Sequence, residues 1–189
     1  MGSLHPALFL LLGSLLIPVF RGRARQGLIL VLPALGFVNL LYLETGTIWV
    51  TAFSRYELTT LRADKLSMLF GYLFHVAAFI ASVYALHVKD GLQPFTGLMY
   101  AGAAVGAVYA GDLIMLFIFW ELLAVTSVFQ IWARRTQRAN DAGMRYLLLH
   151  VTSGLLLLCG AALHYNDTGS LAFVHMELSS WASWLLFLA

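Results

Sequence analysis

Residues 113–133 read LIMLFIFWELLAVTSVFQIWA, and this stretch decides the fold. It is long enough and apolar enough to cross a lipid bilayer as a helix of about 20 residues. Glu121 lies at its centre. The residues three, four and seven positions away share its helix face and are all apolar, so its own helix cannot support its charge. Glu121 therefore stays protonated or finds a partner on another helix.

The composition is that of an integral membrane protein. Of 189 residues, 61% are hydrophobic and 11% are charged, and the mean hydropathy of +0.84 lies far above that of an ordinary soluble domain. The net charge is only +2, without a basic and aromatic surface pattern, so no nucleic acid is expected as a partner. Cys159 is the single cysteine, which excludes an internal disulfide, a CxxC pair or a thiolate metal site. We expect no metal and no cofactor, and any redox groups belong to other subunits.

Six apolar segments are long enough to be predicted as membrane spans. They cover residues 4–20, 27–43, 66–88, 95–110, 113–133 and 142–165, and a further apolar run at 181–189 is too short to span. Positive charges follow the first segment instead of preceding it, so it is predicted to be a retained span and not a signal peptide. The predicted fold class is an all-α integral membrane protein. It has about six transmembrane helices plus the start of a seventh, in a single transmembrane domain over residues 1–189.

One long connection, residues 44–65, contains two stretches in which apolar and polar residues alternate. They are 47–53 and 56–61, and they flank Ser54 and Arg55. This alternation is typical of β-strands, so a small β-hairpin is predicted in this second loop. The other connections are short, at residues 21–26, 89–93, 111–112 and 134–141.

Positive charges are distributed unevenly among these connections. With the amino terminus outside, the outer connections carry Arg55, Arg62 and Lys65, whereas the inner ones carry seven cations. Short cytoplasmic loops are enriched in Lys and Arg, which favours this orientation for a multi-pass protein of the inner (plasma) membrane. The seven inner cations are Arg21, Arg23, Arg25, Lys89, Arg134, Arg135 and Arg138.

Two histidines inside predicted spans are candidates for a proton relay. His75 shares a helix face with small and polar residues, and a neutral histidine hydrogen-bonded across a helix interface is the simpler interpretation. His150 shares a face with Tyr146, Ser153 and Gly154, and for it both interpretations stay open. Two such histidines beside one buried carboxyl would form a chain of titratable groups. They would also be possible axial ligands in a redox anchor, although the chain offers no haem motif.

Other polar and small residues are assigned structural roles. Arg145 lies about one turn inside the sixth span, where snorkelling to the inner surface accounts for it. Asp112 opens the fifth span, where a carboxylate caps free amide groups. Gly102 and Gly106 form a small-residue stripe typical of helix packing. A structural carboxyl would sit at a helix end or beside a partner; Glu121 has neither, so proton transfer is predicted for it.

Several motifs resemble a known family. They are GDL, FWEL and SVF at residues 111–113, 119–122 and 127–129, followed by AGMRY at 142–146 and SG at 153–154. This set is similar to the fifth and sixth helices of the antiporter-like subunits shared by respiratory complex I (NADH:quinone oxidoreductase) and the Mrp-type Na⁺/H⁺ antiporters. Residues 62–70, RADKLSMLF, resemble the entrance to that family's third helix. The resemblance covers nearly the whole chain and is closest to the D-type subunit of the Mrp antiporters.

The resemblance implies a role for Glu121. In that family the fifth-helix glutamate, matched here by Glu121, pairs with a lysine on a broken seventh helix as part of the proton pathway. The sequence ends at Ala189, where the seventh helix would start, so it resembles the N-terminal half-module without that lysine. Arg145 stands where relatives carry a basic residue of lesser role. His150 matches no functional position of the family, and its role rests on the residues alone.

These features predict a membrane subunit of a multisubunit monovalent cation (Na⁺ or K⁺)/proton antiporter, or of a redox-driven proton-pumping complex. Glu121 would supply the carboxyl of its proton pathway. Expected partners are other membrane subunits, including a chain that supplies the seventh-helix lysine, together with H⁺, Na⁺ or K⁺ and the lipid bilayer. The chain is expected to be a transporter subunit rather than an enzyme. The alternative is a non-conducting structural or assembly subunit, or an inactive split-gene fragment.

Overall fold

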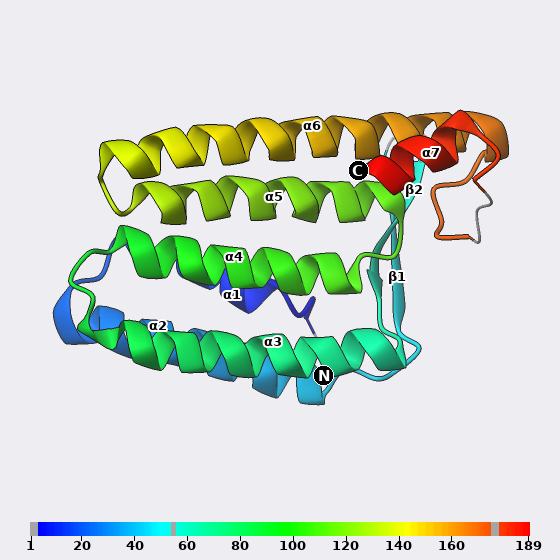
Figure 1. Cartoon of the computed structure of the whole chain (residues 1–189). Coiled ribbons are helices and arrows are strands. Elements are labelled where there is room, and N and C mark those ends of the chain that lie inside the picture. Colours follow the sequence, from blue (N-terminus) through cyan, green and yellow to red (C-terminus); the bar gives the residue numbers. More distant parts are fainter. Residues whose placement is uncertain (1–3, 54–55, 175–177) are drawn as a thin grey trace.

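The computed structural model describes residues 4–53, 56–174 and 178–189 as a bundle of helices with one small hairpin. Figure 1 shows the long helices lying side by side, with α2 and α3 on one side, α5 and α6 on the other, and α4 between them. The elements are α1 (Leu8–Ser14), α2 (Gly22–Leu41), β1 (Ile48–Phe53), β2 (Tyr56–Arg62), α3 (Lys65–Tyr84), the 3₁₀ turn η1 (Ala85–His87), α4 (Leu92–Tyr109), α5 (Leu113–Trp132), α6 (Gln137–Thr168) and α7 (Trp181–Leu188).

Four helices among the described residues are long and apolar enough to cross a membrane, by length and composition. They are α2, α3 together with η1, α5 and α6. Each of the seven predicted apolar segments contains a helix, but the expected count of six full spans is not matched. Large side chains on the outside of the bundle are apolar, as on α6, where Leu148 is 66% and Leu149 is 74% exposed. Such a surface is compatible with lipid and unfavourable in water.

The first predicted span differs most from the structure. Helix α1 has seven residues, and the predicted continuous span over 4–20 is wrong. At the end of α1 the backbone hydrogen bonds change to the 3₁₀ pattern, which joins residues three apart instead of four. They run from Leu15 N to Leu12 O and from Ile17 N to Ser14 O. Pro18 then has no N–H with which to continue a helix. The segment therefore ends its α-helix within two turns.

Two basic stretches that were predicted as connections are partly helical. Helix α2 begins at Gly22, inside 21–26, and α6 begins at Gln137, inside 134–141. The side-chain hydroxyl of Thr136 accepts a hydrogen bond from Ala139 N at 3.1 Å and so caps α6. With 32 residues, α6 is about 48 Å long, longer than the apolar core of a bilayer is thick.

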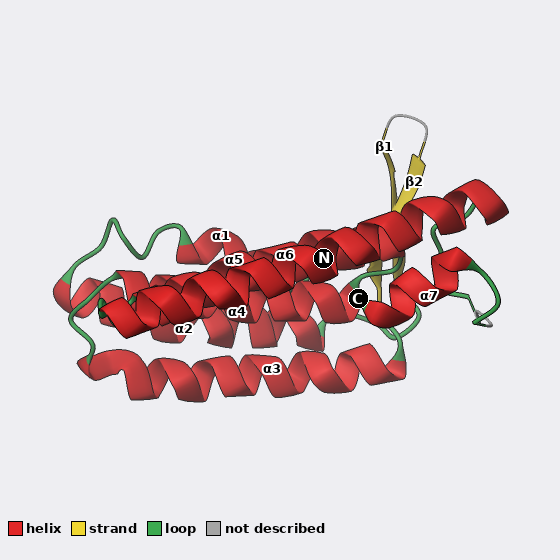
Figure 2. Ribbon diagram, turned by 45° about the horizontal axis from the view of Figure 1, so that its top comes forward, coloured by secondary structure: helices red, strands yellow, loops and turns green. Residues whose placement is uncertain are grey.

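The predicted hairpin is confirmed. Strands β1 and β2 pair antiparallel, with a register shift between Trp49 and Val50, while the predicted turn at Ser54 and Arg55 lies outside the described residues. Figure 2 shows the hairpin standing out from one end of the bundle.

Asp112 fastens this hairpin to α5. One carboxylate oxygen, Oδ1, accepts a hydrogen bond from Met115 N at 2.8 Å and caps the helix, while Oδ2 accepts one from Thr59 N in β2 at 2.5 Å. The N–H of Gly111 also donates to the carbonyl oxygen of Thr59 at 3.0 Å. Asp112 is only 2% exposed, so its carboxylate is satisfied by backbone donors from two segments.

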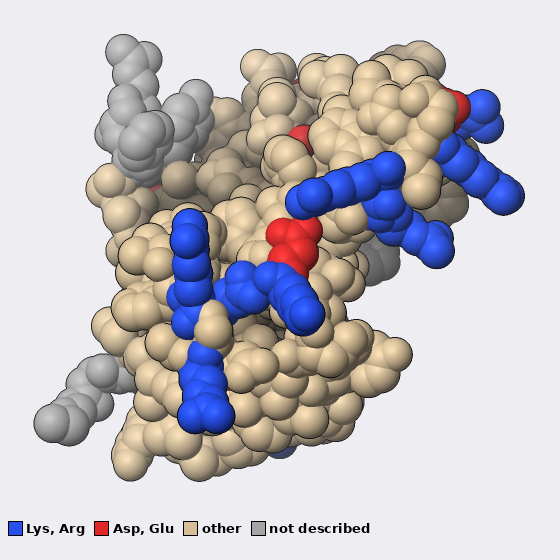
Figure 3. Space-filling model, turned by 90° about the vertical axis from the view of Figure 1, so that its left-hand side faces the viewer, with Lys and Arg blue, Asp and Glu red and all other residues tan. Residues whose placement is uncertain are grey.

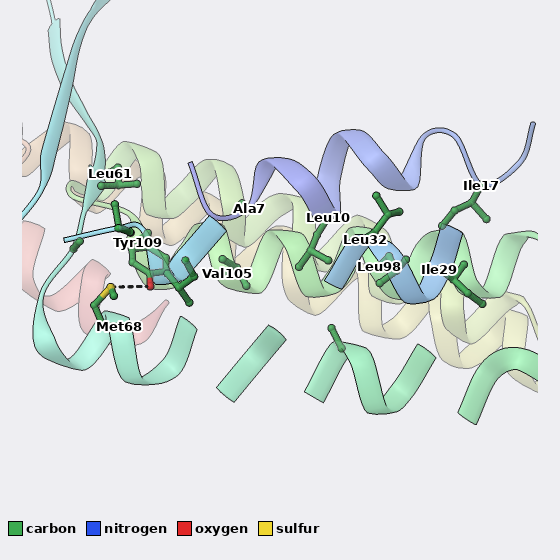
Figure 4. Packing of buried hydrophobic residues seen from close by; sticks show 14 residues of the cluster. Ala7, Leu10, Ile17, Ile29, Leu32, Leu61, Met68, Leu98, Val105 and Tyr109 are labelled. Atoms are coloured by element: carbon green, nitrogen blue, oxygen red, sulfur yellow. Dashed lines mark hydrogen bonds between the residues drawn. The ribbon is translucent and has the colours of Figure 1, made fainter. Parts of the chain in front are cut away.

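The apolar core lies among α1, α2, α3 and α4, and Figure 4 shows its side chains meeting there. Tyr109 is fully buried, and its hydroxyl donates to Met68 Sδ at 3.5 Å. Small residues of α4 allow it to pack closely against α1 and α5. A methyl group at Gly102 would come within 2.8 Å of Leu11 on α1, and one at Gly106 would overlap the ring of Phe119 on α5. The two glycines therefore lie at helix contacts of α4.

Lys and Arg side chains gather at the end of the bundle where α2, α4 and α6 begin (Figure 3). Arg135 forms an ion pair there with Asp90 at 3.2 Å, and Arg25 Nη2 donates to the carbonyl oxygen of Lys89 at 2.6 Å. The fold thus brings basic residues from three separate connections onto one end, which is called the basic end below.

Candidate functional site

Glu121 lies at the middle of α5, on the side that faces α6. A methyl group placed on Gly154 of α6 would overlap Glu121 Oε1 and would come within 2.8 Å of its Cδ. The carboxyl therefore rests directly against the α6 backbone, at a position that only a glycine leaves open. Glu121 Oε1 is buried although the whole residue is partly exposed.

His150 lies one helical turn before Gly154 and points into the same interface. Its ring centroid is 4.4 Å from that of Tyr146 and 6.2 Å from that of Trp120 on α5. Glu121 contacts Gly154, one helical turn from His150, so the carboxyl and the imidazole lie in the same part of the α5–α6 interface. The spacing of four residues from Tyr146 to His150 and from His150 to Gly154 puts all three on one face of α6.

A hydrogen bond extends this group toward the basic end. The hydroxyls of Ser127 on α5 and Tyr146 on α6 lie 2.7 Å apart, and the Ser127 hydroxyl also donates to the carbonyl oxygen of Ala124 at 2.9 Å. We call Trp120, Glu121, Ser127, Tyr146 and His150 the α5–α6 cluster. It is a row of polar groups along the contact between two apolar helices.

The α5–α6 cluster contains most of the unsatisfied polar atoms in the described part of the chain. Among all described residues, four buried side-chain atoms have no hydrogen-bond partner. Three of the four belong to the α5–α6 cluster: Trp120 Nε1, Glu121 Oε1 and His150 Nδ1. A buried polar atom without a partner lowers the free energy of unfolding by about 1–3 kcal/mol. Three such atoms at one place destabilise the fold, so a role in stability does not explain them. Carboxyl and imidazole groups side by side can accept and release protons. The cluster is therefore the best candidate for a functional site.

His75 is not part of this cluster. The fourth unsatisfied atom is its Nε2, which lies against Gly36 of α2, and its Nδ1–H donates to the carbonyl oxygen of Gly71 at 2.8 Å. Helix α3 packs against α2 and α4, whereas α5 packs against α4 and α6. The predicted juxtaposition of two histidines with Glu121 is thus wrong for His75, because the fold puts α4 between them.

Other predicted positions lie outside the cluster as well. Arg145 is exposed on α6, one residue away from Tyr146 and therefore on a different helix face. Ser153 shares the predicted stripe of His150, but its hydroxyl donates to the carbonyl oxygen of Ala189, at the end of α7. The residues of this stripe on α6 therefore face two different neighbours: His150 faces α5, and Ser153 faces the end of α7.

Trp120 and Ser127 were not among the predicted site residues. A serine within the apolar run 113–133 was a signal that could have indicated Ser127, since its hydroxyl needs a partner in a membrane span. For Trp120 the available signal was its place in the FWEL motif, which is part of the family resemblance. No sequence pattern marked His5 either, which is 9% exposed and whose Nε2 lies 3.1 Å from the carbonyl oxygen of Thr60.

The sequence of this chain is similar to one family of known proteins. A family model described as NADH:quinone oxidoreductase/Mrp antiporter, transmembrane, matches residues 110–189, which include α5, α6 and α7. NAD(P)H-quinone oxidoreductase subunit 2 of Picosynechococcus sp. is 30% identical over 169 residues, which are 84% of this chain and 31% of that protein. The A-type subunit of the Na⁺/H⁺ antiporter of Alkalihalophilus pseudofirmus is 32% identical over 119 residues, or 59% of this chain and 15% of that one.

A solved structure shows the same fold. The Mrp complex from Dietzia sp. contains a chain that superposes with a TM-score of 0.77 at 22% identity, over 88% of this chain and 20% of that chain. The present chain spans about a third or less of the curated relatives above. These relatives come from both kinds of complex, so the assignment to the D-type Mrp subunit stays a prediction. Residues 110–189 thus match the family of membrane subunits shared by NADH:quinone oxidoreductase and the Mrp antiporters, and the relative from Picosynechococcus sp. extends this similarity to 84% of the chain.

Proposed function

We propose that this chain is a membrane subunit of a monovalent cation (Na⁺ or K⁺)/proton antiporter or of a redox-driven proton-pumping complex, with Glu121 as a proton-transfer carboxyl. One observation carries the proposal: three of the four unsatisfied buried polar atoms in the described residues gather around Glu121 between α5 and α6. The family supports it, since its members above are named as antiporter and quinone oxidoreductase subunits.

In the proposed mechanism, Glu121 alternates between the carboxyl and the carboxylate. A carboxylate in apolar surroundings needs a cation nearby, and protonation of His150 would supply one from within the chain. A lysine on a companion polypeptide would supply a second: its approach favours the carboxylate, and its withdrawal returns the proton. Ser127 and Tyr146, already hydrogen-bonded to each other, would carry protons between this pair and the basic end.

The proposed surroundings of the chain follow from this mechanism. Its partners would be other membrane subunits, including the one that supplies the seventh-helix lysine, and its transported ions would be H⁺ and Na⁺ or K⁺. The chain would act in transport and leave redox chemistry to its partners. The basic end supports an orientation in the inner (plasma) membrane with the amino terminus outside, because Lys and Arg are enriched on the cytoplasmic side.

The proposal predicts that the chain needs its partners for transport. Proteoliposomes that contain only this polypeptide should show no cation-dependent proton flux, whereas vesicles with the assembled complex should show it. In the proposed mechanism the companion lysine is the cation that approaches and withdraws. Without it nothing switches Glu121 between its two protonation states, and a group that does not cycle cannot transfer protons. A pH-sensitive dye inside the vesicles measures the flux. Strong flux from the chain alone would reject the need for a companion, and no flux from a complex that assembles normally would favour a purely structural role.

The orientation has its own test. After Cys159→Ala, cysteines introduced at Arg23 and Gln137 should react with a membrane-impermeant maleimide only from the cytoplasmic side, and one at Thr45 only from outside. All three positions are exposed, and Arg23 is preferable to Gly22, whose φ of 60° favours glycine. The opposite labelling pattern would mean that the amino terminus is inside.

A further inference from the structure

A hollow of about 510 Å³ opens at the basic end, between the start of α2 and the end of α3. Three cations line it, from Arg21, Arg25 and Lys89, and no carboxylate does. Within the described residues the ion pairs are Arg62 with Asp64 and Arg135 with Asp90, so the three cations face one another unpaired. The other lining residues are Gly22, Gln26, Leu86, His87 and Val88. Like charges crowded around a cavity favour an anion inside it.

A second hollow, also of about 510 Å³, is an apolar groove between α3 and α4. Its walls are mostly alanines and other small residues, including Ala77, Ala81, Gly97 and Ala101, and Gln130 of α5 also lines it. Tyr84 and Ala85 line the groove, and the residues that follow them, from Leu86 to Lys89, line the basic hollow. The side chains that line the groove are mostly apolar, as a hydrocarbon chain requires.

The side chain of Arg25 reaches from the basic hollow to the start of α4. Its Nη2 donates to the carbonyl oxygen of Lys89 in the basic hollow. Its Nη1 lies so near the start of α4 that a methyl group on Gly91 would come within 3.0 Å of it. The next residues of α4, Gln93 and Pro94, line the groove. A guanidinium group therefore lies in the basic hollow and close to the first residues of α4 that line the groove.

We propose that these hollows bind one anionic phospholipid, with the phosphate group in the basic hollow and an acyl chain in the groove. Arg25 would bind the phosphate with its fork of donors, and Arg21 and Lys89 would add charge. The nearby carboxylate of Asp90 is occupied by Arg135, so it leaves the charge of Arg25 and Lys89 uncompensated. A small soluble anion would match the basic hollow only, whereas a phospholipid matches both. This site lies apart from the α5–α6 cluster and does not depend on its proposed role.

Native mass spectrometry of the purified full chain tests the proposal. Wild type should retain phosphatidylglycerol in preference to phosphatidylcholine with the same acyl chains. Arg25→Gln combined with Lys89→Gln should weaken phosphatidylglycerol binding about 25-fold, at about fivefold per cation, and abolish the preference. Arg134→Gln combined with Arg138→Gln removes two cations from the same end but outside the hollow, and should leave the preference in place.

The groove has a matched pair of variants. Ala81→Phe fills it from an exposed position and should weaken both lipids about tenfold, the equivalent of about two buried CH₂ groups. Ala162→Phe, on an exposed face of α6, should change neither. Three results would overturn the proposal. The first is an equal loss of phosphatidylglycerol binding in the Arg25/Lys89 and the Arg134/Arg138 double variants, and the second is unchanged lipid binding by Ala81→Phe. The third is competition by glycerophosphoglycerol, which lacks acyl chains, that is as strong as competition by the lipid.

Discussion

Glu121→Gln should abolish cation-coupled proton transport by the assembled complex, while the complex still forms at normal abundance. Glutamine keeps the size of the side chain and can form hydrogen bonds, but it cannot take up and release a proton. Loss of a positioned proton-transfer group typically lowers a rate by about 100-fold or more. The measurement is proton flux per assembled complex, in membrane vesicles, for the variant against wild type.

Two substitutions outside the α5–α6 cluster are its controls. His75→Gln, at the α2–α3 contact, should mainly lower stability, because His75 is fully buried against Gly36. Arg145→Lys should have little effect on flux, since the side chain is exposed and a snorkelling cation needs only charge and length. If Glu121→Gln keeps flux within about twofold of wild type, Glu121 is a permanently protonated hydrogen-bond donor at a helix contact, and the proposed function is wrong.

Gly154→Ala should have the second largest effect, although it leaves every titratable group in place. The new methyl group would overlap Glu121 Oε1, so the carboxyl must leave its place against the backbone of α6. A displacement of about 1 Å at a reacting group can lower a rate about 100-fold. The fold should survive, because the displaced atoms are the end of a flexible side chain. Proton flux and the amount of assembled complex would be measured on the same vesicles.

Gly27→Ala is the matched control for this variant. It makes the same change within α2, where a methyl group would meet nothing within 4 Å. Both variants gain about 0.5–1 kcal/mol of helix propensity, so the difference between them reports the collision with Glu121. Equal and near-normal flux in the two variants would show that the position of the carboxyl against α6 does not matter for transport.

Local sequence patterns located the elements of the fold but did not give the ends of all of them. Apolar runs of membrane length identified the segments in which the helices lie, and alternation on both sides of Ser54 and Arg55 predicted the hairpin. These patterns work because a helix and a strand each repeat their side chains with a fixed period. Helix ends were harder: Thr136 caps α6 within a basic stretch that looked like a loop, and the turn after Ser14 ends α1 early.

The candidate site needed the structure, because it depends on which helices are neighbours. Nothing local to residues 113–133 tells that Glu121 faces Gly154, or that Trp120 and Ser127 complete the group around His150. Helical periodicity gives the face of each residue but not the helix that the face meets. For the same reason the sequence made both His75 and His150 candidates for a relay beside Glu121, although an interface role was the simpler interpretation of His75; in the fold α4 separates His75 from α5.

The double hydrogen bonding of Asp112 has a mechanical consequence. The same carboxylate holds the first turn of α5 and the backbone of β2, so a shift of α5 along its axis would pull the hairpin with it. Asp112 stands nine residues before Glu121, about 13.5 Å along the helix. Because the hairpin projects from the bundle, a displacement of its strands would be transmitted through Asp112 to the helix that bears Glu121.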